Sequence, residues 1–441
     1  MVHWGQSHVD ITMTVQRRAR GPPEARVVRL PQRTHEAFMR EGKPNPAASA
    51  LAPAGGGGFW GWLARAQQLR RRIPMPVKAM VFRFLPRDKI EEQWWAADDP
   101  YANAEEVSTY PARVDVRLGI LKEFTHAHKH YIGACRDMGV PYRLIDLAAP
   151  DWVSRVRQSG CDAFLVHPSA HMTIWKRMFD ERLKVLADDM GKTIYPSYEE
   201  LWLYEGKRRM CYWLRAHGLP HPRTWVFFSR RQALEFCRTA PLPIVFKSDL
   251  GAGASGVRIF RRRGALERFV NFCFTKGVVR RNGDPRDRQW GTVLLQEYIA
   301  DAREWRLIRI GDSYFGYEKL RVGDFHSGSH AWRYERPSDA LLDLLKKICD
   351  CGRFTSMDLD VLVAPDGRMF VTEMQSVFGM GHPYEMCVVD DKPGRMVYEA
   401  DTHTWRFEAG SFCQNYLCDR RVEVVLKQLG VGLPTPAPSV R

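Results

Sequence analysis

Residues Pro243–Phe260 read PIVFKSDLGAGASGVRIF: an apolar run, one lysine, a loop of small residues and a second apolar run. The loop contains three glycines and a serine, Gly251, Gly253, Gly256 and Ser255. Glycines tolerate positive φ and let the backbone approach a ligand closely. Such a loop can turn its N–H groups toward an anion, with Lys247 as a fixed positive charge beside it. The mobile turn of a β-hairpin explains the same pattern, so this stretch predicts a phosphate site only together with the rest of the chain.

The composition is that of a globular chain in a reducing compartment. Its 441 residues are 45% hydrophobic and 12% aromatic, enough for two or three domains with a large core. No run approaches the roughly 20 apolar residues of a membrane span. The N-terminus lacks the basic-then-apolar order of a secretory signal. The ten cysteines are scattered without a CxxC pair, as reduced core residues are. We therefore expect a cytoplasmic protein without a membrane span.

Residues 1–76 form a strongly basic segment. They hold twelve Lys and Arg against four Asp and Glu, which accounts for +8 of the formal net charge of +15. Stretches so rich in Pro, Gly, Ala and Arg bury little apolar surface, so we expect a disordered tail. This tail could contact nucleic acid or another anionic surface, although a solvated tail is the commoner role of such a charge run.

From about Val114 short apolar runs alternate with helical patterns. The runs that predict strands are VDVRLGIL, PYRLIDL, CDAFLVHP and KTIYPS, and KAMVFRFLP before them is a candidate edge strand. Helical patterns ending at glycine separate these runs. Alternation of this kind is typical of a doubly wound parallel sheet.

Two further units are expected from Tyr198 onward. One helix is predicted through residues 198–218, ending at Gly218, and the opening stretch then forms a hairpin between two helices. After TVLLQEYI the pattern alternates strands and glycine turns. The stretch MDLDVLVAPDGRMFVTEMQ predicts a hairpin with its turn at Pro365–Gly367.

Two carboxylates are expected to meet in that last hairpin. Asp360 begins one predicted strand and Glu373 ends its partner, thirteen residues later, so a turn near the middle brings them side by side. Gln375 lies on the same face as Glu373 by strand alternation. Carboxylate and amide oxygens are ligands that Mg²⁺ takes, usually together with phosphates. A solvated hairpin end explains these charges equally well from the pattern alone.

Four stretches follow one another in an order and spacing that resemble the ATP-grasp superfamily. They are EGKRRMCYWLRAHGLPHPRT, PIVFKSDLGAGASGV, VLLQEYI with EWRLIRIG, and DLDVLVAPDGRMFVTEMQ. The resemblance covers about residues 114–381 and is strongest to carboxylate–amine ligases such as glutathione synthetase, D-alanine–D-alanine ligase and the ribosomal-protein glutamate ligases. It implies an α/β fold, in which an N-terminal doubly wound domain precedes two α+β subdomains that grip ATP.

By this resemblance the chain divides into five parts. They are a basic tail (1–76), a pre-ATP-grasp α/β domain (77–197), a first ATP-grasp subdomain with the glycine-rich lid loop (198–290), a second with the metal-binding hairpin (291–430), and a flexible C-terminal tail (431–441).

The resemblance also assigns ten residues to the nucleotide: Lys207, Lys247, Gly251, Gly253, Ser255, Gly256, Gln296, Glu297, Ile299 and Glu304. In this assignment the two lysines contact the α- and β-phosphates, and the glycine loop closes over the phosphates as a lid. Residues of VLLQEYI form the adenine hinge, and Glu304 binds the ribose.

The remaining assignments concern the metal ion and the transferred group. Asp360, Glu373 and Gln375 would hold one or two Mg²⁺ ions, with Mn²⁺ as an alternative. Arg306 and Lys319 would stabilise the charge of the transferred phosphoryl or acylphosphate group. The chain departs from the family at Gln375, where Asn is usual.

The implied function is ATP- and Mg²⁺-dependent joining of a small-molecule carboxylate to an amine through an acylphosphate, with release of ADP and phosphate. Amino acids or peptide-like molecules suit this chemistry as substrates. Two alternatives stay open: an ATP-binding protein without ligase activity that serves as a regulatory or scaffold module, and an anion-binding module working through the basic tail. Dimers are frequent among the proteins that the chain resembles, so a homodimer is one state we consider.

Overall fold

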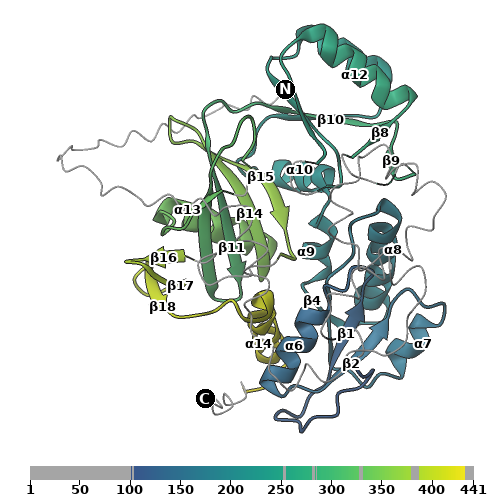
Figure 1. Cartoon of the computed structure of the whole chain (residues 1–441), viewed down its shortest axis with the longest axis vertical. Coiled ribbons are helices and arrows are strands. Elements are labelled where there is room, and N and C mark those ends of the chain that lie inside the picture. Colours follow the sequence, from purple (N-terminus) through teal and green to yellow (C-terminus); the bar gives the residue numbers. More distant parts are fainter. Residues whose placement is uncertain are drawn as a thin grey trace, which may run out of the picture.

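The computed structural model describes residues 101, 104–251, 255–280, 284, 286–326, 331–378 and 387–432. Several expectations lie outside the described residues: the basic tail 1–76, the candidate edge strand KAMVFRFLP, Gly253 of the glycine loop and the end of the C-terminal tail. The described helices and strands form three units, each built on its own sheet (Figure 1). No described helix has the length and apolar character that crossing a membrane requires.

The first unit is the doubly wound parallel sheet that the sequence predicts. Its strands are β1 (Leu118–Lys122), β2 (Tyr142–Asp146), β3 (Ala163–Leu165) and β4 (Thr193–Tyr195), paired in parallel in the order β2-β1-β3-β4. The crossover helices are α6 (Lys129–Met138), α7 (Trp152–Arg157) and α8 (Thr173–Lys184), which continues as the π-helix η2 (Val185–Asp189). Gly139 ends α6 in the left-handed region at φ +68°, a conformation that strains residues with a Cβ.

Residues 198–218 form two helices where the sequence predicts one. They are α9 (Tyr198–Leu203) and α10 (Lys207–Ala216). In the link between them Glu205 has a positive φ of 51° and Gly206 has φ −125°, so neither residue continues the helix. The single-helix prediction is therefore wrong. The break places Lys207 at the start of α10 and leaves Glu205 outside both helices.

The second unit is a four-stranded antiparallel sheet built around the stretch Pro243–Phe260. Its strands are β5 (Thr224–Phe227), β6 (Ile244–Lys247), β7 (Val257–Phe260) and β10 (Val293–Glu297), in the order β5-β10-β6-β7. Helices α11 (Arg230–Thr239) and α12 (Arg263–Thr275) cover one face, over a core that includes Phe246 and Leu295. Alternation turns Lys247 and Gln296 to the other face. A short hairpin, β8 (Val278–Val279) and β9 (Arg288–Gln289), precedes β10.

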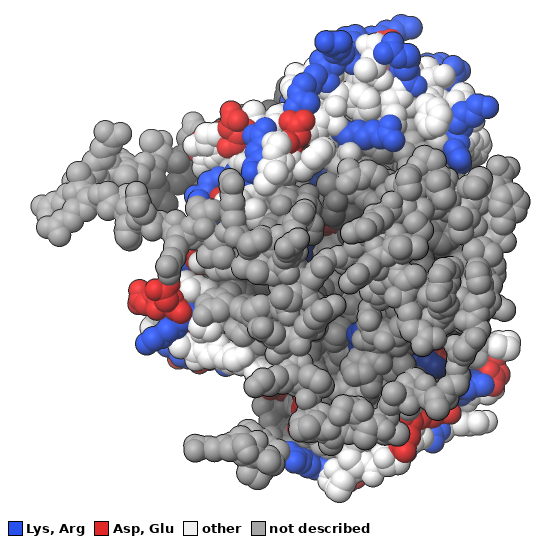
Figure 2. Space-filling model, in the orientation of Figure 1, with Lys and Arg blue, Asp and Glu red and all other residues white. Residues whose placement is uncertain are grey.

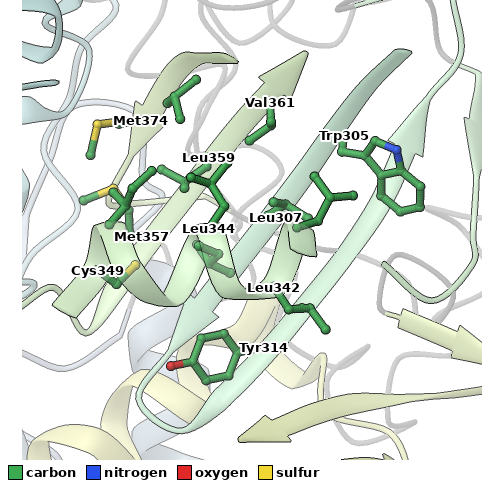
Figure 3. Packing of buried hydrophobic residues seen from close by; sticks show 14 of the residues in the cluster. Trp305, Leu307, Tyr314, Leu342, Leu344, Cys349, Met357, Leu359, Val361 and Met374 are labelled. Carbon is green, nitrogen blue, oxygen red and sulfur yellow. The ribbon is translucent and has the colours of Figure 1, made fainter. Parts of the chain in front are cut away.

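The third unit is an antiparallel sheet in the order β15-β14-β11-β12-β17-β16. Its strands are β11 (Arg303–Ile310), β12 (Ser313–Lys319), β14 (Ser356–Val363), β15 (Met369–Gln375), β16 (Cys387–Val389) and β17 (Lys392–Glu399), with β13 (Trp332–Arg333) beside β12 and β18 (Thr404–Ala409) beside β17. Helix α13 (Asp339–Gly352) packs on one face, and Figure 3 shows Leu307, Leu359 and Met374 of three strands in that core. The predicted hairpin is confirmed as β14 and β15. Asp360 does not begin its strand, however, because pairing of β14 extends back to Ser356.

The chain after the hairpin contains elements that the sequence patterns did not indicate. They are strands β16 to β18, the short 3-10 helix η4 (Gln414–Leu417) and helix α14 (Cys418–Gln428). Helix α14 lies beside α6 of the first unit (Figure 1), and its Val422 and Val425 share a buried cluster with Ile132. Arg421 of the same helix donates to the carbonyl of Phe378 at 2.8 Å. The C-terminal helix therefore joins the first unit to the large sheet.

Exposed basic side chains lie on the second unit. Figure 2 shows Lys and Arg gathered at the top of the molecule, around α12. The exposed arginines of α11, β7 and α12 and of the link between β7 and α12 are Arg230, Arg231, Arg238, Arg258, Arg261, Arg262 and Arg268. Attraction of an anionic molecule to the second unit would therefore not depend on the tail.

Replacement of Phe246 by alanine should lower the free energy of unfolding by about 4 kcal/mol, because the ring is fully buried in the core of the second unit. Urea unfolding followed by circular dichroism measures the loss. Phe228→Ala is the matched control: Phe228 is 63% exposed, and its replacement should cost about 0.5 kcal/mol or less. Equal midpoints for the two variants would show that Phe246 does not lie in a tightly packed core.

Candidate active site

One face of the large sheet carries the charged residues that the resemblance assigns to the nucleotide and the metal ion. Strand alternation separates this face from the one covered by α13. Asp360 is the register partner of Arg306 on β11 and of Glu373 on β15. Lys319 on β12 is the partner of Glu304. The polar residues of this charged face are Glu304, Arg306, Lys319, Asp358, Asp360, Glu373 and Gln375.

Asp360 lies at the centre of the charged face. It is 2% exposed and accepts hydrogen bonds from Arg306, through Nε at 3.0 Å and Nη2 at 3.2 Å. The ammonium group of Lys319 contacts the same carboxylate and also donates to Glu304 Oε1 at 2.9 Å. Burial opposes ionisation of Asp360, but the two cations outweigh it and lower the pKa of this carboxyl far below its usual range. Asp360 is therefore an anion at neutral pH.

Lys207 connects the glycine loop to the hairpin. Its Nζ lies 3.2 Å from Glu373 Oε1 and donates to the carbonyl oxygen of Gly251 at 2.8 Å. Burial acts to lower the pKa of Lys207, but the charge of Glu373 outweighs burial, and the pKa is raised. A charged ammonium group fixed between a loop carbonyl and a carboxylate is well placed to bind a phosphate.

Lys247 reaches the same hairpin from the second unit. Its Nζ donates to the carbonyl oxygen of Thr372 at 3.2 Å. The pairing of β14 with β15 skips Thr372 at a β-bulge, a feature that bends a strand and redirects its groups. Burial lowers the pKa of Lys247, and the nearby charge of Glu373 counteracts part of that effect. The structure thus brings Lys207 and Lys247, from two different elements, to adjacent residues of β15.

Two acidic residues of the site were missed by the sequence reasoning. Glu205, in the link between α9 and α10, accepts hydrogen bonds from the N–H of Gly251 at 2.9 Å and from the amide of Gln375 at 3.3 Å. Asp358 is 1% exposed and shares its strand and face with Asp360. Alternation in MDLD is the signal that could have identified Asp358. Glu205 had no signal of its own, because the helical pattern continues across it.

Part of the predicted metal-ligand set fits a magnesium ion. Asp360 and Glu373 are register partners, and carboxylate oxygens are ligands that Mg²⁺ takes. The amide of Gln375 turns its nitrogen, and not its oxygen, toward the carboxylates. Nε2 donates to Glu373 Oε1 at 2.7 Å, and Oε1 accepts from the N–H of Glu205 at 3.1 Å. Among the described residues no three His, Cys, Asp or Glu side chains come together as metal ligands. The two carboxylates therefore fit the ion, and the amide oxygen of Gln375 does not.

The predicted adenine hinge lies at the end of β10. Gln296 Nε2 donates to Thr224 Oγ1 at 3.0 Å, and Glu297 forms a two-pronged ion pair with Arg223 at 2.9 and 3.1 Å. Both side chains are thus engaged within the second unit. Ile299 is half-buried in the link to β11. Adenine recognition here would rest on backbone groups of this link.

The described part of the glycine loop has structural reasons for its small residues. Gly251 has φ +133°, a conformation open to glycine, and its N–H donates to Glu205. A Cβ at Gly256 would lie 1.6 Å from Ser248 Oγ, so a larger residue fits only if that side chain moves. Ser255 between them is half-buried. Close packing thus explains Gly256 without a phosphate.

No protein-family model matches the chain, and no curated protein matches it. Among solved structures, it is similar to the biotin carboxylase domain of the Hydrogenobacter thermophilus 2-oxoglutarate carboxylase, in complex with MgADP, ADP and bicarbonate, at 15% identity and a TM-score of 0.46. It is also similar to a RimK domain protein ATP-grasp from Sphaerobacter thermophilus, at 19% identity and a TM-score of 0.42. A third is N5-carboxyaminoimidazole ribonucleotide synthetase from Thermotoga maritima, at 14% identity and a TM-score of 0.40.

The three matches cover 60%, 58% and 59% of this chain and 65%, 90% and 68% of the other chains, respectively. The chain therefore spans less than two thirds of the carboxylase structure. One of these structures is described as an ATP-grasp, and the sheets above confirm the mixed α/β class. At TM-scores below 0.5 the likeness carries no argument about the reaction, which is argued below from this chain's own residues.

Replacement of Glu373 by glutamine should lower the free energy of unfolding by about 3 kcal/mol, because Lys207 then keeps a buried charge without its carboxylate. Urea unfolding measures this loss. In the double variant Lys207→Met/Glu373→Gln most of the loss should be recovered. The exposed pair Lys184–Asp188 is the control, and Asp188→Asn should cost about 0.5 kcal/mol or less. Additive losses in the double variant would contradict the coupling of Lys207 to Glu373.

Proposed function

We propose that this chain is an ATP- and Mg²⁺-dependent ligase that joins a carboxylate to an amine through an acylphosphate, with release of ADP and phosphate. The observation that carries the proposal is the convergence of Lys207 from α10 and Lys247 from β6 on adjacent residues of β15. They meet there beside the register pair Asp360 and Glu373. Two ammonium groups beside two carboxylates provide the charges that a triphosphate and its metal ion require.

In this proposal Lys207 and Lys247 bind the phosphates of ATP, and Arg306 and Lys319 lie beside the γ-phosphoryl group. The substrate carboxylate attacks the γ-phosphorus in line, so that an acylphosphate forms and ADP leaves. The amine then attacks the acyl carbon and loses a proton, and phosphate departs to leave an amide. The chain's cations are in place before the reaction, and such fixed charges stabilise the charge that develops on the transferred group.

Asp360 and Glu373 are the residues that would hold the metal ion. Bound there, Mg²⁺ would neutralise charge on the phosphate oxygens, and Mn²⁺ accepts the same oxygen ligands. The proposed substrates are small molecules, an amino acid or a peptide-like acid and an amine, because the chemistry needs only a carboxylate and a nucleophilic nitrogen.

An ATP-binding protein without ligase activity is the second candidate. The amide of Gln375 favours it, because its oxygen is bonded to the N–H of Glu205 and not presented beside the carboxylates. A screen of amino acids and small acids for stimulated phosphate release separates the two. ADP formation that requires both a carboxylate and an amine supports the ligase. Nucleotide binding without turnover across the panel supports the second candidate.

Lys247→Ala should reduce ATP turnover at least roughly 100-fold, because a fixed positive charge at the phosphates of ATP is lost. ADP release under the stimulating pair of substrates measures the effect, and thermal unfolding checks that the variant is folded. Lys276→Ala is the matched control, since Lys276 is an exposed lysine of the same unit and its replacement should leave turnover unchanged. Wild-type turnover in Lys247→Ala would remove this lysine from the proposed site.

A further inference from the structure

Asp358 is a buried aspartate to which the proposed function gives no role. It lies on β14 two residues before Asp360, on the same face, and is 1% exposed. Within the part of the chain that the structure describes, neither of its carboxylate oxygens has a hydrogen-bond partner. A buried polar group without hydrogen bonds is costly, so its presence here calls for a partner in another state of the site.

Arg306 lies between the two aspartates. Its Nε is 3.0 Å from Asp360 Oδ1, to which it donates, and 3.1 Å from Asp358 Oδ2. Its Nη2 donates to Asp360 Oδ2 at 3.2 Å. The guanidinium group is thus committed to Asp360, while Asp358 stands at ion-pair distance with its hydrogen-bonding capacity unused. A small change of side-chain conformation is enough to transfer Arg306 from one carboxylate to the other.

In the proposed reaction Asp360 also has to bind the metal ion. Mg²⁺ takes oxygen ligands at about 2.1 Å, so an oxygen of Asp360 must exchange a bonded cation for the ion. Both oxygens are now engaged by Arg306, and Lys319 contacts the same group. Lys319 has a second carboxylate in Glu304, at 2.9 Å. Among the described residues, Asp358 and Asp360 are the carboxylates that pair with Arg306. A half-buried cation that loses its acidic partner is disfavoured, so Arg306 needs Asp358 when Asp360 binds the ion.

We propose that Asp358 takes over Arg306 when Asp360 binds the metal ion, which makes Asp358 a positioning residue for metal binding. The inference rests on the proposed function, because it requires that the metal–nucleotide complex bind at the charged face. Arg306 keeps a carboxylate partner in both states and stays beside the transferred phosphate. Asp358 in turn gains the hydrogen bonds that it lacks in the present structure.

The test uses the contribution of Mg²⁺ to ADP binding. Calorimetry measures the affinity of the full chain for ADP with saturating Mg²⁺ and again after chelation by EDTA. The first affinity divided by the second gives a ratio that reports the contribution of the metal ion. This ratio is compared among the wild type, Asp358→Asn, Arg306→Met and the double variant. In Asp358→Asn the ratio should fall roughly tenfold or more, because one charge-assisted interaction of Arg306 is lost on metal binding. In Arg306→Met it should be at least that of the wild type. The double variant should stay within about threefold of Arg306→Met, since Asp358 acts through Arg306.

Asp366→Asn is the matched control: Asp366 is an exposed aspartate in the turn of the same hairpin, and its replacement should not change the ratio. Asn has the size of Asp, and thermal unfolding verifies that Asp358→Asn is folded. An unchanged ratio in Asp358→Asn overturns the exchange. A double variant as weak as Asp358→Asn also overturns it, because Asp358 would then act on the metal ion without Arg306. If the wild type binds ADP with the same affinity with and without Mg²⁺, the proposed function itself is refuted, and the exchange with it.

Discussion

Two ammonium groups contact β15 of the large sheet, one from the second unit and one from α10. Lys247 donates to the carbonyl of Thr372, and Lys207 pairs with Glu373 on the next residue of β15. These contacts use groups that a triphosphate would also engage. A ligand that took over Lys247 would therefore replace one of the contacts between the second unit and the large sheet. The β-bulge at Thr372 is part of this arrangement, since it interrupts regular pairing where Lys247 binds.

The charged face can exist without a ligand because its charges neutralise one another. Lys319 bridges Glu304 and Asp360, and Arg306 bridges Asp358 and Asp360. Each of these contacts is buried or half-buried, where an unpaired charge is costly. The same network fixes the cations before any substrate arrives. Fixed charges need little reorganisation during a reaction, so they can stabilise charge that develops on a reacting group.

Local periodicity predicted the parallel sheet and the hairpin in which Asp360 meets Glu373, because strand alternation and a central turn determine which residues of a hairpin pair. It could not predict the break at Glu205, where a single positive φ interrupts an otherwise continuous helical pattern. Local patterns also could not predict the orientation of the Gln375 amide, because its partner Glu205 lies 170 residues away in the sequence. The contact of helix α14 with α6 depends on tertiary packing between distant parts of the chain. The amide orientation and the contact of α14 with α6 are therefore determined by contacts between segments that are distant in the sequence.

The location of a bound nucleotide tests the central claim most directly. A crystal structure of the full chain with ADP and Mg²⁺ is expected to show the diphosphate within hydrogen-bond distance of Lys207 and Lys247, with the ion coordinated by Asp360 and Glu373. A nucleotide bound at any other surface, or an ion held away from both carboxylates, would contradict the account.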